Sequence, residues 1–252
     1  MMDYRGGRTT AWNTNTASLA PSRIAFLKKV YVLFTASVAF SAAGALVALN
    51  LGTDVAQSVQ IGRAHTVVPP LVAFFANHPF VSLGIMLAVV FGASWVRHKP
   101  VINVVALFGM ASILGVIFAP ALFYAQLRAG MGATLSASPV RDAFLLSVIG
   151  FGGLTTYALV SRKDFSFLGG ALTMGLFVVF GAAILNMFLG SSIFGLAISS
   201  VAVLLFGAYV LYDTSRLLRS DESDAVGGAI GLYFDFINIF LSLLHILSGR
   251  RE

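Results

Sequence analysis

The chain has 252 residues, of which 58% are hydrophobic and 10% are charged, whereas an average soluble domain has about 25% charged residues, so the sequence indicates an integral membrane protein. The net charge is +6, but the basic residues are scattered among short polar segments rather than gathered with aromatic residues, which excludes a nucleic-acid interface. There are no cysteines, so thiolate metal sites and cysteine catalysis are excluded as well.

Residues 1–23 are rich in Thr, Asn and Ser and lack helical periodicity, which predicts a flexible polar tail. Residues 24–252 contain apolar runs of about 18 residues or more, each long enough to cross the hydrocarbon core as a helix. The predicted spans are 26–49, 71–96, 101–124, 143–160, 167–189, 192–217 and 227–247. The predicted fold is therefore an all-α integral membrane protein with seven transmembrane helices. The glycines at the start of the last span leave a re-entrant segment as the alternative there.

The positions of Lys and Arg predict the orientation of these spans. With the amino terminus inside the cell, eleven of the 16 basic residues lie in cytoplasmic segments and five lie on the other side. Because short cytoplasmic loops are enriched in Lys and Arg, this difference favours a multi-pass protein whose amino terminus is cytoplasmic.

Two aspartates interrupt the apolar spans near the carboxyl end of the chain. Of the ten acidic residues, only Asp213 and Asp235 lie inside predicted spans, where an ionised carboxylate costs several kcal/mol. A tight hairpin between the last two spans makes them antiparallel and places both aspartates at similar depth. Two carboxylates in a medium of low dielectric constant do not both ionise readily, so the pair is expected to share a proton. Their oxygens also suit Ca²⁺, which predicts a cation site at the same two residues.

Further polar side chains follow both aspartates at helical spacing and predict one polar seam between the last two helices. The supporting residues are Tyr209 and Arg216 around the first aspartate, and Asn238 and Ser242 after the second. For the amide and the hydroxyl, simple hydrogen bonding between helices is the alternative. Arg97 ends the second span on the same side of the membrane as Asp213, where it is either a third member of the seam or a snorkelling anchor.

Three stretches resemble the Bax inhibitor-1 (TMBIM) family in its bacterial inner-membrane branch: LYDTSRL at 211–217, LYFDFINIFLSLLHIL at 232–247 and SRKDFSFLGGAL at 161–172. The resemblance extends over roughly residues 26–247. It implies six helices around a central seventh and a pH-sensitive Ca²⁺ leak through the cytoplasmic (inner) membrane. It also implies that Asp213 and Asp235 form the proton-sharing pair and that Arg97 latches onto the first of them.

The leading functional prediction is therefore a pH-sensitive calcium leak channel, with the lipid bilayer, Ca²⁺ and protons as partners and no bound cofactor. One alternative is a non-transporting regulator of a translocon or of a membrane quality-control protease, such as a membrane-anchored AAA protease. A cation/proton exchanger is another. Intramembrane aspartyl proteases also use two aspartates on neighbouring helices, but here the second aspartate lies in LYFDF rather than in GxGD, so no enzyme activity is predicted.

Overall fold

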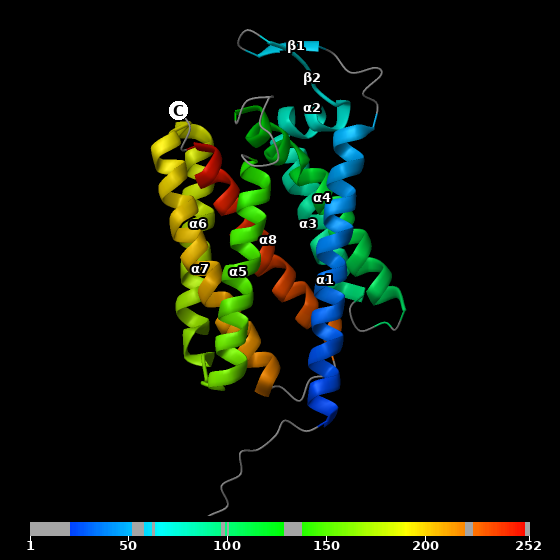
Figure 1. Ribbon diagram of the computed structural model, residues 1–252, viewed down its shortest axis with the longest axis vertical. Helices are drawn as coiled ribbons and strands as arrows, with labels where there is room; N and C mark the ends of the chain where they lie inside the picture. The colour runs from blue at the N-terminus through cyan, green and yellow to red at the C-terminus, as the bar shows by residue number, and fades with distance from the viewer. Residues whose placement is uncertain are drawn as a thin grey trace, which may run out of the picture.

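The computed structural model describes residues 21–51, 58–61, 64–96, 99, 101–128, 138–219 and 224–249. It is a bundle of long helices with a small β-hairpin at one end (Figure 1). Seven helices are long and apolar enough to cross a membrane, as predicted. They are α1 (Pro21–Asn50), α3 (Pro79–Val96), α4 (Ile102–Arg128), α5 (Pro139–Ser161), α6 (Gly169–Leu189) preceded by the 3₁₀ turn η3 (Ser166–Leu168), α7 (Ser192–Arg219) and α8 (Ala225–Gly249).

The start of the helical region differs from the sequence prediction, whereas its last span agrees with it. Helix α1 begins at Pro21, inside the segment predicted to be a tail, because proline is well suited to the first turn of a helix, where its missing N–H is not needed. Residues 1–20 lie outside the described part of the chain. The last span is one continuous helix of 25 residues, which is long enough for the predicted complete span and favours it over a re-entrant segment.

The second predicted span, 71–96, is wrong as a single helix. It consists of α2 (Pro70–Asn77) and α3, separated at His78, which has φ −123° and ψ 65°. Pro79 explains the break, because proline donates no backbone hydrogen bond and forces the preceding residue out of the helical region. Only α3 is long enough to span, and α2 lies at the end of the bundle near the hairpin (Figure 1).

The β-hairpin was not predicted. Strands β1 (Ser58–Ile61) and β2 (Ala64–Val67) pair antiparallel, with Ser58 opposite Val67 and Ile61 opposite Ala64. The available signal was two short runs, SVQI and AHTV, separated by a glycine and an arginine. Both runs are too short to stand out beside the apolar helices.

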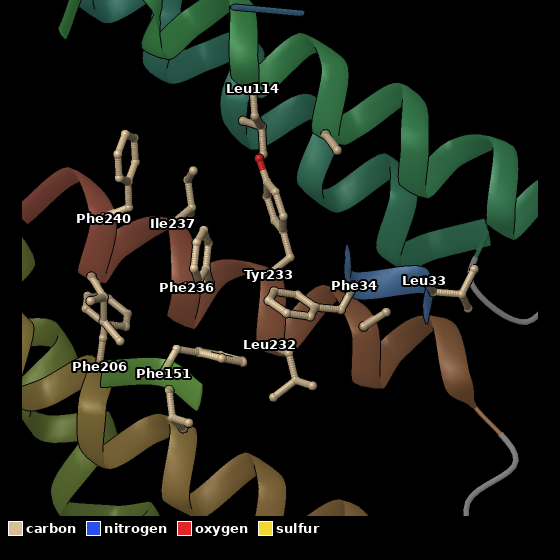
Figure 2. Packing of buried hydrophobic residues seen from close by; sticks show 14 of the residues in the cluster. Leu33, Phe34, Leu114, Phe151, Phe206, Leu232, Tyr233, Phe236, Ile237 and Phe240 are labelled. Atoms are coloured by element: carbon tan, nitrogen blue, oxygen red, sulfur yellow. The ribbon is translucent and has the colours of Figure 1, made fainter. Parts of the chain in front are cut away.

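Helix α8 lies in the core of the bundle. A larger share of it is buried than of any other candidate span, and it contacts α1, α4, α5 and α7. Phe34 of α1 stacks on Phe151 of α5 at 4.9 Å, and Phe236 of α8 meets both rings edge-on at 5.8 and 5.7 Å (Figure 2). These aromatic contacts fix α8 between α1 and α5. A complete ring of six helices around it stays a prediction.

A single buried hydrogen bond between α8 and α1 allows a test of this packing. The hydroxyl of Tyr233, which is fully buried, donates to Ser41 Oγ at 3.0 Å. We expect Tyr233→Phe to lower the free energy of unfolding by about 1 kcal/mol, because Ser41 loses its partner inside the bundle. Denaturant unfolding in detergent measures this change. The control is Tyr157→Phe, which alters an exposed ring on α5, and equal effects of both substitutions would contradict the expectation.

Candidate functional site

Asp213 and Asp235 lie on the antiparallel helices α7 and α8, near the face of the bundle where α1 begins, here called the N-terminal face (Figure 1). Asp213 is about 9 Å from the end of α7 at Arg219, and Asp235 is about 15 Å from the start of α8 at Ala225, at 1.5 Å per residue. Both aspartates are thus in the half of the helix bundle next to the N-terminal face.

Asp213 and Asp235 both lie at the contact between α7 and α8. They are close enough for the charge of Asp213 to act on Asp235. A Cβ atom at Gly231 of α8 would lie 2.8 Å from Oδ2 of Asp213, so the first carboxylate lies directly against the α8 backbone. Gly231 precedes Asp235 by one helical turn, which places it on the same face of α8. The structure therefore places the two carboxylates near enough to interact through their charges, and a proton shared between them stays a prediction.

Asp235 is the more enclosed of the pair. Its side chain is 3% exposed, and within the described part of the chain its Oδ2 has no hydrogen-bond partner. A buried carboxylate oxygen without a partner is costly, so this atom calls for a proton, a water molecule or a cation. Asp213 is half-buried and also feels the charge of Arg216, whose side chain is exposed. One carboxylate is thus partly accessible from outside and the other is enclosed.

Three of the other predicted site residues, Tyr209, Asn238 and Arg97, differ in how they relate to the aspartates. Tyr209 is near enough to both aspartates to interact with their charges, so it belongs to the site. Asn238 donates its amide to the Phe234 carbonyl at 2.8 Å, a bond within α8 rather than between helices. Arg97 lies outside the described residues, so the latch that it forms in the sequence prediction stays a prediction.

Ser242 lines a cavity at the opposite end of α8. This cavity has a volume of about 580 Å³ and is here called the C-terminal cavity. Its polar lining includes Ser82, Tyr124, Arg128, Ser199, Ser242 and His245, from α3, α4, α7 and α8. Because Ser242 follows Asp235 by two helical turns, the polar face of α8 leads from the aspartates to this cavity. The sequence indicated the polar face but not the cavity.

Gly231 is a site residue that the sequence analysis missed. The glycines at the start of the last span were interpreted only as a weakness of that helix. The structure shows that the missing side chain of Gly231 leaves room for the Asp213 carboxylate. The position of Gly231 one turn before Asp235 was the only signal in the sequence, and it becomes informative once α7 and α8 are known to be in register.

The described residues contain no group of three or more His, Asp or Glu side chains that could hold a metal ion. Two carboxylates supply only part of the six to eight oxygen ligands that Ca²⁺ takes. Carbonyl oxygens and water molecules must provide the rest. The two aspartates alone are therefore an incomplete set of ligands for Ca²⁺.

One family profile and several known proteins are similar to this chain over most of its length. A family profile described as "Inhibitor of apoptosis-promoting Bax1" matches residues 23–252. An uncharacterised Campylobacter jejuni protein is 33% identical over 94% of this chain and 92% of its own length. The mouse protein lifeguard 4 is 31% identical over 90% of this chain and 86% of its own. The Escherichia coli K12 protein YccA, named a modulator of FtsH protease, is 34% identical over 60% of this chain and 66% of its own length.

Proposed function

We propose that this chain, which belongs to the Bax inhibitor-1 family, is a pH-sensitive Ca²⁺ leak of the cytoplasmic membrane, gated by the Asp213–Asp235 pair. The observation that carries the proposal is the enclosed Oδ2 of Asp235, which has no hydrogen-bond partner among the described residues, in a side chain close enough to Asp213 to interact with its charge. Such a pair holds a proton or a hard cation, and the two compete for the same oxygens.

In this proposal the number of protons on the pair sets the state of the gate. When the pair carries one proton, the two carboxylates attract each other through it and hold α7 against α8. When the last proton leaves, two negative charges repel at short range in a medium of low dielectric constant. In that state, we propose, Arg97 approaches from the N-terminal face and forms an ion pair with Asp213. The local change in charge therefore acts on a two-state contact between helices.

The proposed route for the ion follows the polar face of α8. Ca²⁺ enters at the N-terminal face, which we propose to be cytoplasmic, and exchanges water for carboxylate oxygens at the pair. Asn238 and Ser242 then lead to the C-terminal cavity, whose serines, tyrosine and histidine offer oxygen and nitrogen ligands. In this proposal the two aspartates bind the transported ion and do not act as a protease.

Flux measurements on the purified full chain in liposomes test the proposal. We expect Asp235→Asn and Asp213→Asn each to reduce the change in Ca²⁺ flux between about pH 6 and pH 8 by about tenfold, because an amide cannot share or release the proton. Flux is read with an encapsulated Ca²⁺ indicator, and the liposomes are matched for protein content and orientation.

The matched control is Asp164→Asn, which removes the same charge from an exposed position. The backbone N–H of Ser166 donates to Asp164 at 2.9 Å and holds the pKa of that carboxyl below its usual range, so it stays ionised throughout the assay. An unchanged pH response in both seam variants contradicts the proposal. A fixed ratio of protons to Ca²⁺ in the wild-type flux instead identifies an exchanger.

A second candidate function is regulation of a membrane-anchored AAA protease, and it rests on one comparison. The relative named a modulator of FtsH protease covers 60% of this chain. If this function is correct, the full chain co-purifies with such a protease and the Asp213→Asn variant does so equally well. If Asp213→Asn loses the Ca²⁺ flux but still co-purifies with the protease, the chain has two separate roles. If the protease does not co-purify with the wild-type chain, transport remains as the function.

A further inference from the structure

A second cavity, separate from the aspartate pair, lies in the half of the bundle away from the N-terminal face. Its volume is about 500 Å³, within the range of cavities that bind small ligands. Its walls come from Val38–Leu49 of α1, Gly115–Gln126 of α4, the first turns of α5 and Phe236–Phe240 of α8. Eleven steps along α1 give it a length of about 16 Å. It is here called the α1/α5 cavity.

The α1/α5 cavity is closed on the side of the aspartates and open toward the surrounding lipid. Phe236 lines it and also packs against Phe34 and Phe151, so this wall is backed by aromatic rings (Figure 2). Leu46 of α1 and Phe144 of α5 both line the cavity, yet they are 59% and 42% exposed. Because both helices span the membrane, the opening between these side chains faces hydrocarbon.

The deep part of the α1/α5 cavity does not suit water. Its walls there are apolar apart from Ser41, whose hydroxyl already accepts a hydrogen bond from Tyr233. Water in a cavity needs two to four polar partners, and apolar cavities without them stay dry. A space of this size that opens into a bilayer is best filled by a hydrocarbon chain from that bilayer. The length of about 16 Å suits the greater part of one acyl chain.

Polar and charged groups are gathered at the mouth of the α1/α5 cavity. Ser138 caps α5 and donates to Gln126 Oε1 at 3.0 Å, and both residues line the cavity. Arg141 also lines it and forms an ion pair with Asp142 at 2.7 Å, in which both side chains are partly exposed. The mouth thus presents one cation and one anion side by side at the membrane-surface end of α5.

We propose that the α1/α5 cavity binds one acyl chain of a bilayer phospholipid whose zwitterionic headgroup carries a primary ammonium. The phosphate accepts hydrogen bonds from Arg141, and the ammonium donates to Asp142, so each charge of the headgroup meets its opposite. An anionic lipid without an ammonium would use Arg141 for its phosphate and would offer Asp142 no donor in exchange. A quaternary ammonium has no N–H to donate.

Photolabelling of the full chain in nanodiscs tests the lipid site. The bilayer is phosphatidylcholine and phosphatidylglycerol with a trace of phosphatidylethanolamine that carries a photoreactive group in the middle of one acyl chain. We expect the label to concentrate in peptides that contain 38–49 and 139–144. Ala42→Phe, which fills the cavity from α1, should reduce this labelling by about tenfold, equivalent to about 1.4 kcal/mol of lost affinity.

The matched control is Ala43→Phe, the same substitution at the next residue of α1, which is exposed and does not line the cavity. Should Ala42→Phe fail to fold, Leu46→Trp blocks the opening, with Val47→Trp as its control. Equal labelling in a variant and its control overturns the proposal, as does labelling spread evenly over the lipid-facing helices.

Competition identifies the headgroup. We expect unlabelled phosphatidylethanolamine to displace the photolipid at lower concentration than phosphatidylglycerol or phosphatidylcholine does, and Asp142→Asn to remove this preference without removing the labelling. Equal competition by all three lipids in the wild-type protein overturns the assignment of the headgroup.

Discussion

We expect Gly115→Leu to prevent stable assembly of the helix bundle. A Cβ atom at Gly115 of α4 would fall on the backbone carbonyl oxygen of Ser41, and a Cβ atom at Gly44 of α1 would fall on that of Ser112. No change of rotamer relieves a clash with backbone, so α1 and α4 must move apart. They share a larger contact than any other pair of described helices. The cost is on the order of 3 kcal/mol or more, because close approach of backbones is what holds membrane helices together.

The measurement is the yield of monodisperse protein in detergent and the midpoint of its thermal unfolding. The control is Gly109→Leu on the same helix, since a Cβ atom at Gly109 would meet nothing within 4 Å. The unfolding midpoint of Gly115→Ala should lie between those of Gly115→Leu and Gly109→Leu. Equal midpoints for Gly115→Leu and Gly109→Leu contradict the expectation.

The contact between α1 and α4 also bears on the aspartate site. It fixes the position of Ser41, which in turn accepts the hydrogen bond from Tyr233 on α8. Asp235 follows Tyr233 by two residues, so its side chain leaves α8 about 200° around the helix axis from that of Tyr233, on the side toward α7. The small residues of α1 and α4 thus determine how α8 is rotated about its axis. This rotation sets the direction in which the Asp235 side chain points.

The sequence was sufficient for those features that depend on single residues and their spacing along the chain. The seven spans follow from long apolar runs, which nothing in a soluble domain would explain. Asp213 and Asp235 stood out because ionisable groups are costly in lipid, and the short connection between the last two spans placed them at similar depth. Among the spans, the break at Pro79 was overlooked, since apolar residues continue on both sides of it.

Features that depend on contacts between distant segments were beyond the sequence. The role of Gly231 follows from which side chain of α7 lies opposite it, and the α1/α5 cavity requires four helices in their final positions. The aromatic contacts of Phe34 with Phe151 and with Phe236 join residues that are more than a hundred positions apart. Helical periodicity shows which residues share a face but not which face they meet.

Gly231→Ala is the change that we expect to alter the Ca²⁺ flux without removing any charge. The added Cβ atom would lie 2.8 Å from Oδ2 of Asp213, closer than such atoms approach, so the carboxylate must move away from α8. The spacing of the pair then changes while both aspartates remain. We expect the pH response of the liposome flux to be displaced by about one pH unit, since one unit corresponds to only about 1.4 kcal/mol of changed interaction.

A structural defect is distinguished from this effect by Gly228→Ala, the same substitution one turn earlier on α8. There the new Cβ atom would lie 2.7 Å from the flexible end of Leu217, an apolar side chain that can rotate away. Both substitutions raise helix propensity by about 1 kcal/mol, so neither should lower the unfolding midpoint. A displaced pH response in Gly231→Ala alone assigns the effect to the carboxylates. Superimposed responses in wild type and Gly231→Ala would show that the position of Asp213 does not control the leak.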